Sequence, residues 1–343
     1  MTGRQGRERG AVAFAGCALM ALVAGCSAPV AVPVSTAAQV PVAAVTTVAM
    51  TAAATRAPAV TVTRPGGRWA GHQVAVLRLS HTALRLTLHP GMRTNYSHVY
   101  DPGASTHWTM PPVLAPARPW QVGLAATFNG GFKLTNGDSH GGYWDTGYGI
   151  NGSHSVVRDP SGARTLTKGA ASLVIYRDGT WALGTWGHEV AMTPQVRFVR
   201  QELLPLVDRS TINPLTSSAD CQLHWGITMN DSSSQWYQHH CDPWRSGVGI
   251  TATGDLVYVS GHYLTPHDLA VLLRQAGAVR AMQLDINQQW ISAMTYNSSA
   301  VPRGHSAVPH VVNSPYNTPT HYISGSASSG TAANRDFFAA YLR

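Results

Sequence analysis

The sequence predicts an α+β fold, with a mainly antiparallel or mixed sheet, hairpins and a few packed helices. Several segments alternate apolar and polar residues with the period of a strand, and turn sequences separate them. One segment, residues 265–277, changes to the period of a helix. No internal repeat is visible, so a solenoid or propeller is not indicated.

The N-terminal segment has the marks of a secretory signal. Arg4, Arg7 and Arg9 precede an apolar stretch that is too short for a permanent transmembrane helix, which needs about 20 residues. The stretch ends in LVAGC, which resembles the bacterial lipobox, whose cysteine becomes the lipidated first residue. We expect residues 1–25 to be removed and Cys26 to anchor the protein on the outer side of the cell membrane. Ordinary secretion with cleavage nearby is the alternative.

The composition changes near residue 66. Residues 26–65 are rich in Ala, Val, Pro and Thr and contain no aromatic residue. Such a segment cannot bury an apolar face, so it predicts a partly extended tether. Trp, Tyr, His and alternating apolar positions then continue to the end of the chain, so residues 66–343 are expected to form one folded domain or two closely packed lobes.

Two cysteines, Cys221 and Cys241, remain after removal of the signal and lipidation. An even pair in an oxidising compartment predicts a disulfide. Three histidines lie nearby in the sequence, but their spacing matches no standard zinc pattern, so a disulfide is favoured over a metal site.

The net charge of +8 reflects 24 Lys and Arg against 16 Asp and Glu. The basic residues are scattered arginines and form no basic run, so nucleic acid is not expected as a partner. The charge is compatible with anionic sugars or phosphates.

Hairpins are predicted from alternation and turn residues. Residues 72–80 and 83–91 alternate across a short gap and predict an antiparallel pair. Residues 171–186 predict a hairpin around an Asp-Gly pair, which favours a two-residue turn. Residues 248–261 predict another hairpin, with a Thr-Gly pair at its turn.

The predicted helix has recognisable ends. Thr265 is suited to cap it, Pro266 suits its first turn, and Asp268 lies where the helix dipole is positive. Apolar residues at helical spacing follow, and Gly277 ends the helix. Residues 335–343 are expected to close the domain as a short helix.

The strand expected at residues 279–285 ends in a single carboxylate, Asp285. Alternate residues of a strand face opposite sides, so Met282 and Leu284 are expected in a core while Gln283 and Asp285 share the other face. A polar pair on an otherwise apolar strand suggests a functional site. The alternative is that Asp285 caps the following turn.

Two further segments carry candidate site residues. An apolar strand runs into Asn129, Gly130 and Gly131, and paired glycines let a backbone turn sharply or approach a ligand. Arg245 and Ser246 stand just before another strand, and a guanidinium there suits two oxygens of a phosphate or carboxylate. Taken singly, the glycines are compatible with an ordinary turn and the arginine with a solvated side chain.

In this order the segments resemble the phosphodiester glycosidase domain family. Asn-Gly-Gly-Phe after a strand is followed by Arg-Ser-Gly-Val-Gly, by a helix reading T-x-x-D-L-A-x-L-L, and by A-x-x-L-D. The resemblance spans roughly residues 125–297 and is clearest over residues 245–285. It implies an extracytoplasmic hydrolase that cuts a sugar–phosphate linkage at the anomeric carbon, as does the lysosomal uncovering enzyme of this family.

The chain departs from the family in its last motif. Members continue it as Leu-Asp-Gly-Gly-Gly-Ser, whereas residues 284–290 read LDINQQW. The acid is kept, but a bulkier polar segment replaces the glycine-rich turn. We expect Asn287 and Trp290 to provide contacts in place of the glycine backbone.

The chemistry implied is cleavage of a glycosyl phosphate. Asp285 is assigned as nucleophile or as the base that activates water. Arg245 is assigned to the departing phosphate, and Asn129 and the Gly130 backbone to the sugar or an oxyanion. The other expected substrate-binding residues are Gly131, Ser246, Gln283, Asn287, Trp290 and His262.

Asp145 is the candidate second carboxylate, because it is expected in a glycine-rich aromatic loop suited to sugar stacking; a turn aspartate is the alternative. His262 is placed to shuttle a proton, or is a satisfied polar residue. No metal-binding motif is present, no cofactor is assigned, and a divalent cation at Asp285 stays open.

Two other functions fit the same residues. One is a non-catalytic, glycan-binding lipoprotein of the cell envelope, since ten Trp and twelve Tyr suit sugar stacking with or without turnover. The other is a glycosidase acting on ordinary glycosidic bonds of wall arabinan or galactan. In each case the partner is a carbohydrate or glycosyl phosphate, and the membrane is reached only through the lipid anchor.

Overall fold

The computed structural model describes residues 59–89, 123–132, 141–150, 156–218, 222–226, 244–288, 290–297, 308–313 and 336–343. Cys26, Cys221 and Cys241 lie outside these ranges, so the lipid anchor and the disulfide stay predictions. Within these ranges, no helix combines the length and the apolar character that crossing a membrane requires.

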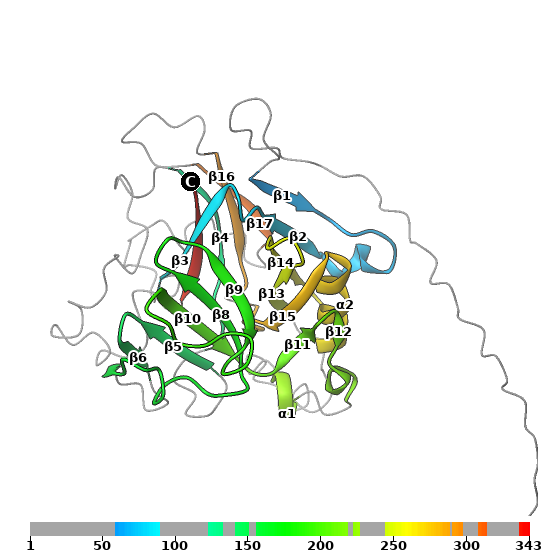
Figure 1. The fold of residues 1–343 in the computed structure, drawn as a ribbon. Helices are drawn as coiled ribbons and strands as arrows, with labels where there is room; N and C mark the ends of the chain where they lie inside the picture. The colour runs from blue at the N-terminus through cyan, green and yellow to red at the C-terminus, as the bar shows by residue number, and fades with distance from the viewer. Residues whose placement is uncertain are drawn as a thin grey trace, which may run out of the picture. The chain divides into compact units, whose positions relative to one another are not determined.

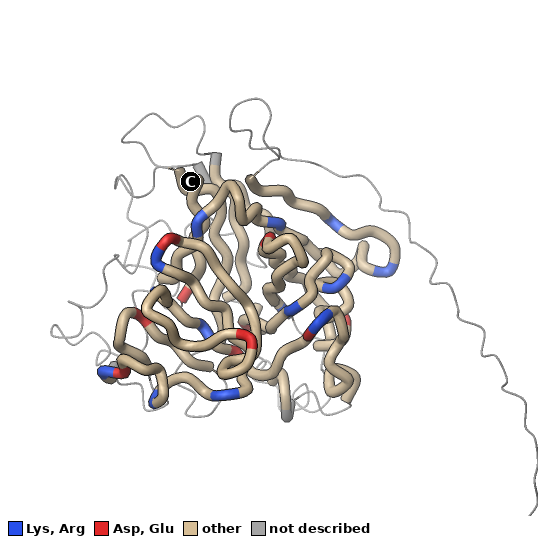
Figure 2. The backbone as a smooth tube through the Cα atoms, in the orientation of Figure 1, with Lys and Arg blue, Asp and Glu red and all other residues tan. Residues whose placement is uncertain are grey.

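The described residues form three sheets and one α-helix of ten residues (Figure 1). Every pairing between named strands is antiparallel. The predicted class, mainly antiparallel sheet with few helices, is therefore confirmed. Charged residues are spread over many elements and gather on none of them (Figure 2).

The largest sheet has the order β1-β2-β14-β13-β15-β11-β12. Its strands are β1 (Val60–Thr63), β2 (Ala75–Leu79), β11 (Pro205–Asp208), β12 (Thr211–Ile212), β13 (Arg245–Thr251), β14 (Leu256–Gly261) and β15 (Ala278–Gln283). The helical segments are η1 (Gly67–His72), η4 (Pro214–Ser217), α1 (Gln222–Trp225) and α2 (Pro266–Gln275).

The other two sheets have the orders β7-β6-β5-β10-β8-β9 and β17-β16-β4-β18-β3. The first contains β5 (Gly141–Asp145), β6 (Tyr148–Ile150), β7 (Val156–Arg158), β8 (Ala171–Tyr176), β9 (Trp181–Thr185) and β10 (Val196–Glu202). The second contains β3 (Leu84–His89), β4 (Leu124–Asn129), β16 (Ala293–Asn297), β17 (Val308–Asn313) and β18 (Phe337–Leu342).

Apolar side chains from all three sheets form one continuous core. Leu77, Phe128 and Leu173 come from different sheets and are fully buried in it. Met282 and Leu284 also lie in this core, whereas Ala281 packs in a second cluster with the helix α2. The two faces predicted for this strand are confirmed.

The two later hairpins form as expected, with one difference in a turn. In the β8–β9 hairpin the Tyr176 N–H donates to the Thr180 carbonyl at 2.8 Å, so the loop contains three residues and not two. Only Gly179 in that loop has positive φ, at 81°. Such a loop needs a single left-handed residue, and glycine supplies it. In the β13–β14 hairpin, Gly254 has φ 94°.

Helix α2 has the predicted ends. The Thr265 hydroxyl accepts from the Asp268 N–H at 3.0 Å, and the Asp268 carboxylate accepts from the Thr265 N–H at 3.2 Å. This reciprocal capping box satisfies two backbone donors of the first turn. Gly277 follows the helix with φ 96°, a conformation that costs glycine little.

Two predictions about the elements are wrong. Strands β2 and β3 form but do not pair with each other, because β2 lies between β1 and β14 while β3 pairs with β18. Residues 337–342 form strand β18 and not a helix, because they pair with β3 on one side and with β4 on the other. The folded part also begins before residue 66, since Val60–Thr63 form β1.

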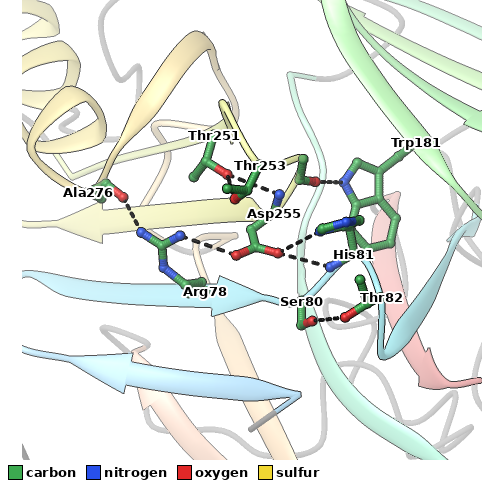
Figure 3. A network of polar contacts seen from close by, with 10 residues as sticks. Arg78, Ser80, His81, Thr82, Trp181, Thr251, Thr253, Asp255 and Ala276 are labelled. Carbon is green, nitrogen blue, oxygen red and sulfur yellow. Dashed lines mark hydrogen bonds and ion pairs between the residues drawn. The ribbon is translucent and has the colours of Figure 1, made fainter. Parts of the chain in front are cut away.

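Asp255, in the β13–β14 turn, holds the β2–β3 connection (Figure 3). Its carboxylate accepts from the His81 N–H at 3.1 Å, contacts the His81 ring at 2.9 Å, and accepts from Arg78 at 3.4 Å. Burial opposes the charge, but these bonds hold the pKa of Asp255 below its usual value. Trp181 of β9 donates to the Gly254 carbonyl of the same turn at 3.0 Å, so elements of all three sheets meet here.

Candidate functional site

Asn129, Ser246 and Asp285 come from distant segments and meet in one hydrogen-bonded cluster. Asn129 ends β4, Ser246 is the second residue of β13, and Asp285 follows β15. The Asn129 amide donates to the Ser246 hydroxyl at 2.9 Å, which donates to the Asp285 carbonyl at 2.7 Å. The Asp285 N–H in turn donates to the Gly130 carbonyl at 3.1 Å. The ends of these strands therefore lie together, as the motif order suggests.

The Asn129 amide is held on both sides. Its Oδ1 accepts from the Tyr258 hydroxyl at 2.6 Å and from the Ser292 N–H at 3.3 Å, and its Nδ2 also donates to the Gly130 carbonyl at 2.8 Å. Burial raises the pKa of Tyr258, so its hydroxyl stays a donor at neutral pH. These contacts fix the orientation of the amide and of the backbone beside it.

The Asp285 side chain caps the turn that follows it. Its Oδ1 accepts from the Asn287 N–H at 2.8 Å, and the Trp290 N–H closes the turn on the Asn287 carbonyl at 2.8 Å. The capping role considered for this residue is therefore present, and it also fixes the direction of the carboxylate. Asn287 and Trp290 are half-buried, beside an Asp285 that is only 2% exposed.

The Arg245 guanidinium holds protein oxygens. It donates to the carbonyls of Leu264 at 2.9 Å, Trp225 at 3.0 Å and Gly226 at 3.1 Å, and to Gln283 Oε1 at 2.7 Å. A guanidinium has five N–H donors, and these bonds use four of them. The geometry thus argues against the phosphate role expected for Arg245 and favours a role in holding these segments.

Three charged residues that the sequence reasoning missed lie beneath the Asn-Gly-Gly-Phe turn: Arg200, Glu202 and Asp336. Each is at most 4% exposed. Arg200 Nε contacts Asp336 Oδ2 at 2.7 Å, and Arg200 Nη1 contacts Glu202 Oε2 at 3.0 Å. Burial raises the pKa of Glu202 to about 8, with further raising by Asp336 and Asp285 and lowering by Arg200.

A sequence signal for part of this cluster exists. Arg200 and Glu202 stand two residues apart in the strand VRFVRQE and so share a face, as Gln283 and Asp285 do. Asp336 gives no such signal, because it lies 136 residues further along the chain.

Asp145 lies apart from this cluster. It is on strand β5, not in a loop, and it pairs with Phe198 of β10 while Gly141, at the other end of β5, pairs with Glu202. That separation along the strand is roughly 13 Å. Asp145 accepts from Thr146 at 2.7 Å and lies 3.7 Å from Arg197, and burial raises its pKa to about 6.

His262 belongs to an aromatic group at the edge of the site. Its ring stacks on Trp244 at 5.3 Å and on Tyr263 at 3.6 Å between centroids. It follows Gly261, the strand partner of Arg245, so it lies one residue beyond the Arg245 end of the hairpin. Tyr263 is 48% exposed. Among the described residues, no group of three or more His, Cys, Asp or Glu side chains is arranged to hold a metal ion.

No family model matches the chain, and no curated protein matches it. Among solved structures, the chain is similar to the zebrafish N-acetylglucosamine-1-phosphodiester α-N-acetylglucosaminidase catalytic domain, auto-inhibited by its pro-peptide. The identity is 14% and the TM-score 0.42, over 79% of this chain and 77% of that one.

Two bacterial structures are also similar. One is a hypothetical protein from Synechocystis, with 12% identity and a TM-score of 0.37 over 83% of this chain and 62% of that one. The other is a putative exported protein from Burkholderia pseudomallei K96243, with 12% identity and a TM-score of 0.30 over 78% of this chain and 73% of that one.

Proposed function

We propose that the protein is an extracytoplasmic hydrolase that cleaves a sugar–phosphate linkage in cell-envelope or exopolysaccharide glycans. The observation that carries this proposal is the meeting of Asn129, Ser246 and Asp285 through hydrogen bonds of 2.7 and 2.9 Å. These residues belong to three of the four motifs that resemble the phosphodiester glycosidase domain. Their meeting supports a common site for the motifs.

In the proposed reaction the Asp285 carboxylate acts at the anomeric carbon. Cleavage there passes through an oxocarbenium-like transition state, which a carboxylate stabilises as nucleophile or as the base for water. Asp285 is buried, and a charge acts more strongly on a developing positive charge where the dielectric is low. The bond from the Asn287 N–H keeps the carboxylate in one orientation.

The other residues of the cluster have positioning roles in this proposal. Asn129 and Ser246 hold the backbone at Asp285, and Arg245 holds Gln283 and the Trp225 carbonyl. The half-buried Asn287 and Trp290, which replace the glycine-rich turn, are the proposed substrate contacts.

The test is the release of sugar by the purified protein from phosphodiester-linked sugars and from plain oligosaccharides. We expect release from the phosphodiesters, and we expect Asp285→Asn to lower kcat by about 100- to 10,000-fold with the thermal midpoint nearly unchanged. Asp208→Asn is the matched control, because Asp208 is 43% exposed at the side chain and lies in a surface ion pair. Unchanged release by Asp285→Asn would contradict the assignment.

The same assay separates the alternatives. Binding of glycan without release, unaffected by Asp285→Asn, would favour the non-catalytic lipoprotein. Release from plain arabinan or galactan alone would favour the ordinary glycosidase.

A further inference from the structure

The peptide groups around Gly130 and Phe132 are bound by charged residues that no motif predicts. The Phe132 N–H donates to Glu202 Oε2 at 3.0 Å, and the Phe132 carbonyl accepts from Arg200 Nη2 at 2.6 Å. The Gly130 N–H donates to the Asp336 carbonyl at 2.8 Å. We propose that Arg200, Glu202 and Asp336 form a clamp that positions the Asn129–Phe132 turn against Asp285.

A continuous path joins the clamp to the proposed carboxylate. Arg200 binds the Asp336 side chain at 2.7 Å, and the Asp336 carbonyl binds the Gly130 N–H. The carbonyl of Gly130 accepts from the Asp285 N–H at 3.1 Å. A shift of Arg200 or Asp336 therefore moves Gly130, and with it the backbone that carries Asp285. Arg200, Glu202 and Asp336 are positioning residues in this scheme, because each acts through the turn.

The space around the turn is filled by the clamp. A Cβ atom on Gly130 would lie 2.0 Å from Asp336 Oδ2, and one on Gly131 would lie 1.9 Å from Glu202 Oε2. Both distances are far shorter than any non-bonded contact allows. A side chain at either glycine would therefore displace a carboxyl group of the clamp.

The clamp contains more carboxyl groups than cations. Asp336 and Glu202 both contact Arg200. The charge of Asp285 also acts on Arg200 and on Glu202. The buried Tyr143 of β5 is another titratable group near the cluster, because the charges of Asp336 and Arg200 act on it. Glu202 Oε1 is buried and has no hydrogen-bond partner among the described residues.

Burial and the missing partner both disfavour a charged Glu202, because a carboxylate needs donors on its oxygens. The clamp therefore works with Glu202 protonated up to a pH of about 8. Above that pH Glu202 carries a negative charge beneath the turn, which strengthens its contacts with the Phe132 N–H and Arg200 and adds repulsion against Asp336 and Asp285.

The first test is spectroscopic and does not depend on the proposed function. The chain has six phenylalanines, so labelling with 15N-phenylalanine gives few amide signals. The signal that is missing from the spectrum of Phe132→Leu is that of the Phe132 amide. We expect the Phe132 amide shift to titrate with a midpoint near pH 8 in the wild-type protein and not in Glu202→Gln. A Phe132 shift that does not move with pH in the wild-type protein would overturn the titrating role of Glu202.

The second test is kinetic and rests on the proposed function. Arg200→Lys keeps the positive charge but loses the planar guanidinium that contacts several oxygens at once. We therefore expect kcat per folded molecule to fall by about tenfold to a hundredfold with KM nearly unchanged. In the wild-type protein we expect kcat to change above pH 8, as Glu202 gains its charge, and we expect this change to be absent in Glu202→Gln because the amide does not titrate.

Arg209→Lys and Glu189→Gln are the matched controls, because these two residues also form an Arg–Glu contact, at 3.4 Å, and Arg209 is 75% exposed at the side chain. A clamp that only stabilises the fold would lower the thermal midpoint of Arg200→Lys and leave its kcat per folded molecule unchanged, which would overturn the positioning role. If the wild-type protein releases no sugar, the proposed function fails, while the amide titration still tests the role of Glu202 beneath the turn.

Discussion

At Gly131 the replacement of one hydrogen by a methyl group is enough to test the packing beneath the turn. The added Cβ would meet Glu202 Oε2 at 1.9 Å and Arg200 Nη2 at 2.7 Å, and both side chains are fully buried. Such overpacking usually costs about 1–3 kcal/mol. We therefore expect Gly131→Ala to lower the free energy of unfolding by that amount, measured by urea denaturation.

Gly71→Ala is the control for this substitution. Gly71 lies in η1, has no positive φ, and a Cβ there would meet nothing within 4 Å. We expect a change within about 0.5 kcal/mol. An equal loss of free energy of unfolding in the two variants would mean that the side chains beneath Gly131 move aside at little cost.

The local sequence placed Asn129 and Asp285 at the ends of apolar strands and Ser246 at the start of another, and the structure brings the three residues together. Their roles stay predictions. The direction of the Arg245 fork could not be predicted, since its carbonyl partners follow from the packing of separate segments. The bond between Arg200 and Asp336 was also out of reach, because it joins residues 136 positions apart.

At the scale of elements, helix α2 offers a direct test. Thr265 bonds the Asp268 N–H at 3.0 Å, and its loss leaves a donor of the first turn unsatisfied. We expect Thr265→Ala to lower the free energy of unfolding by about 1 kcal/mol. The measurement is urea unfolding, with the exposed Thr211 of β12 as the matched Thr→Ala control. A loss at Thr265 no greater than the loss at Thr211 would speak against the capping box.

The elements that the sequence predicted correctly contain their own turn or cap residues, as β8–β9 and α2 do. The FFAAYL segment has no such marker. Its run of apolar residues fits a buried helix and a buried strand equally, and only its neighbours β3 and β4 decide. In the same way, the alternation in β2 and β3 predicts two strands but not their partners, because β1 and β14 occupy the two edges of β2.

For the whole molecule, the raised pKa of Glu202 predicts how stability depends on pH. The folded state keeps the proton up to about pH 8, whereas the unfolded state loses it near 4.5. The stability linked to this proton is therefore complete below pH 4.5 and is lost as pH rises through 8. Each pH unit between these values lowers the free energy of unfolding by up to about 1.4 kcal/mol.

The measurement is urea unfolding of the wild-type protein and Glu202→Gln at pH 6, 7 and 8. Asp145, whose pKa is raised to about 6, contributes equally to the pH dependence of both proteins. Its contribution cancels when their free energies of unfolding are subtracted. We expect the wild-type protein to lose stability relative to the variant as pH rises over this range. If the free energies of unfolding of the two proteins changed with pH in parallel, Glu202 would be ionised in the folded state.

The position of β18 determines when the five-stranded sheet can be completed. It lies between β3 and β4, which have no pairing with each other, and it contains residues 337–342. During synthesis, β3 and β4 leave the ribosome long before their shared neighbour, so the edges that face it stay open and attract foreign strands. The five-stranded sheet is therefore completed only when residues 337–342 are available to pair with both strands.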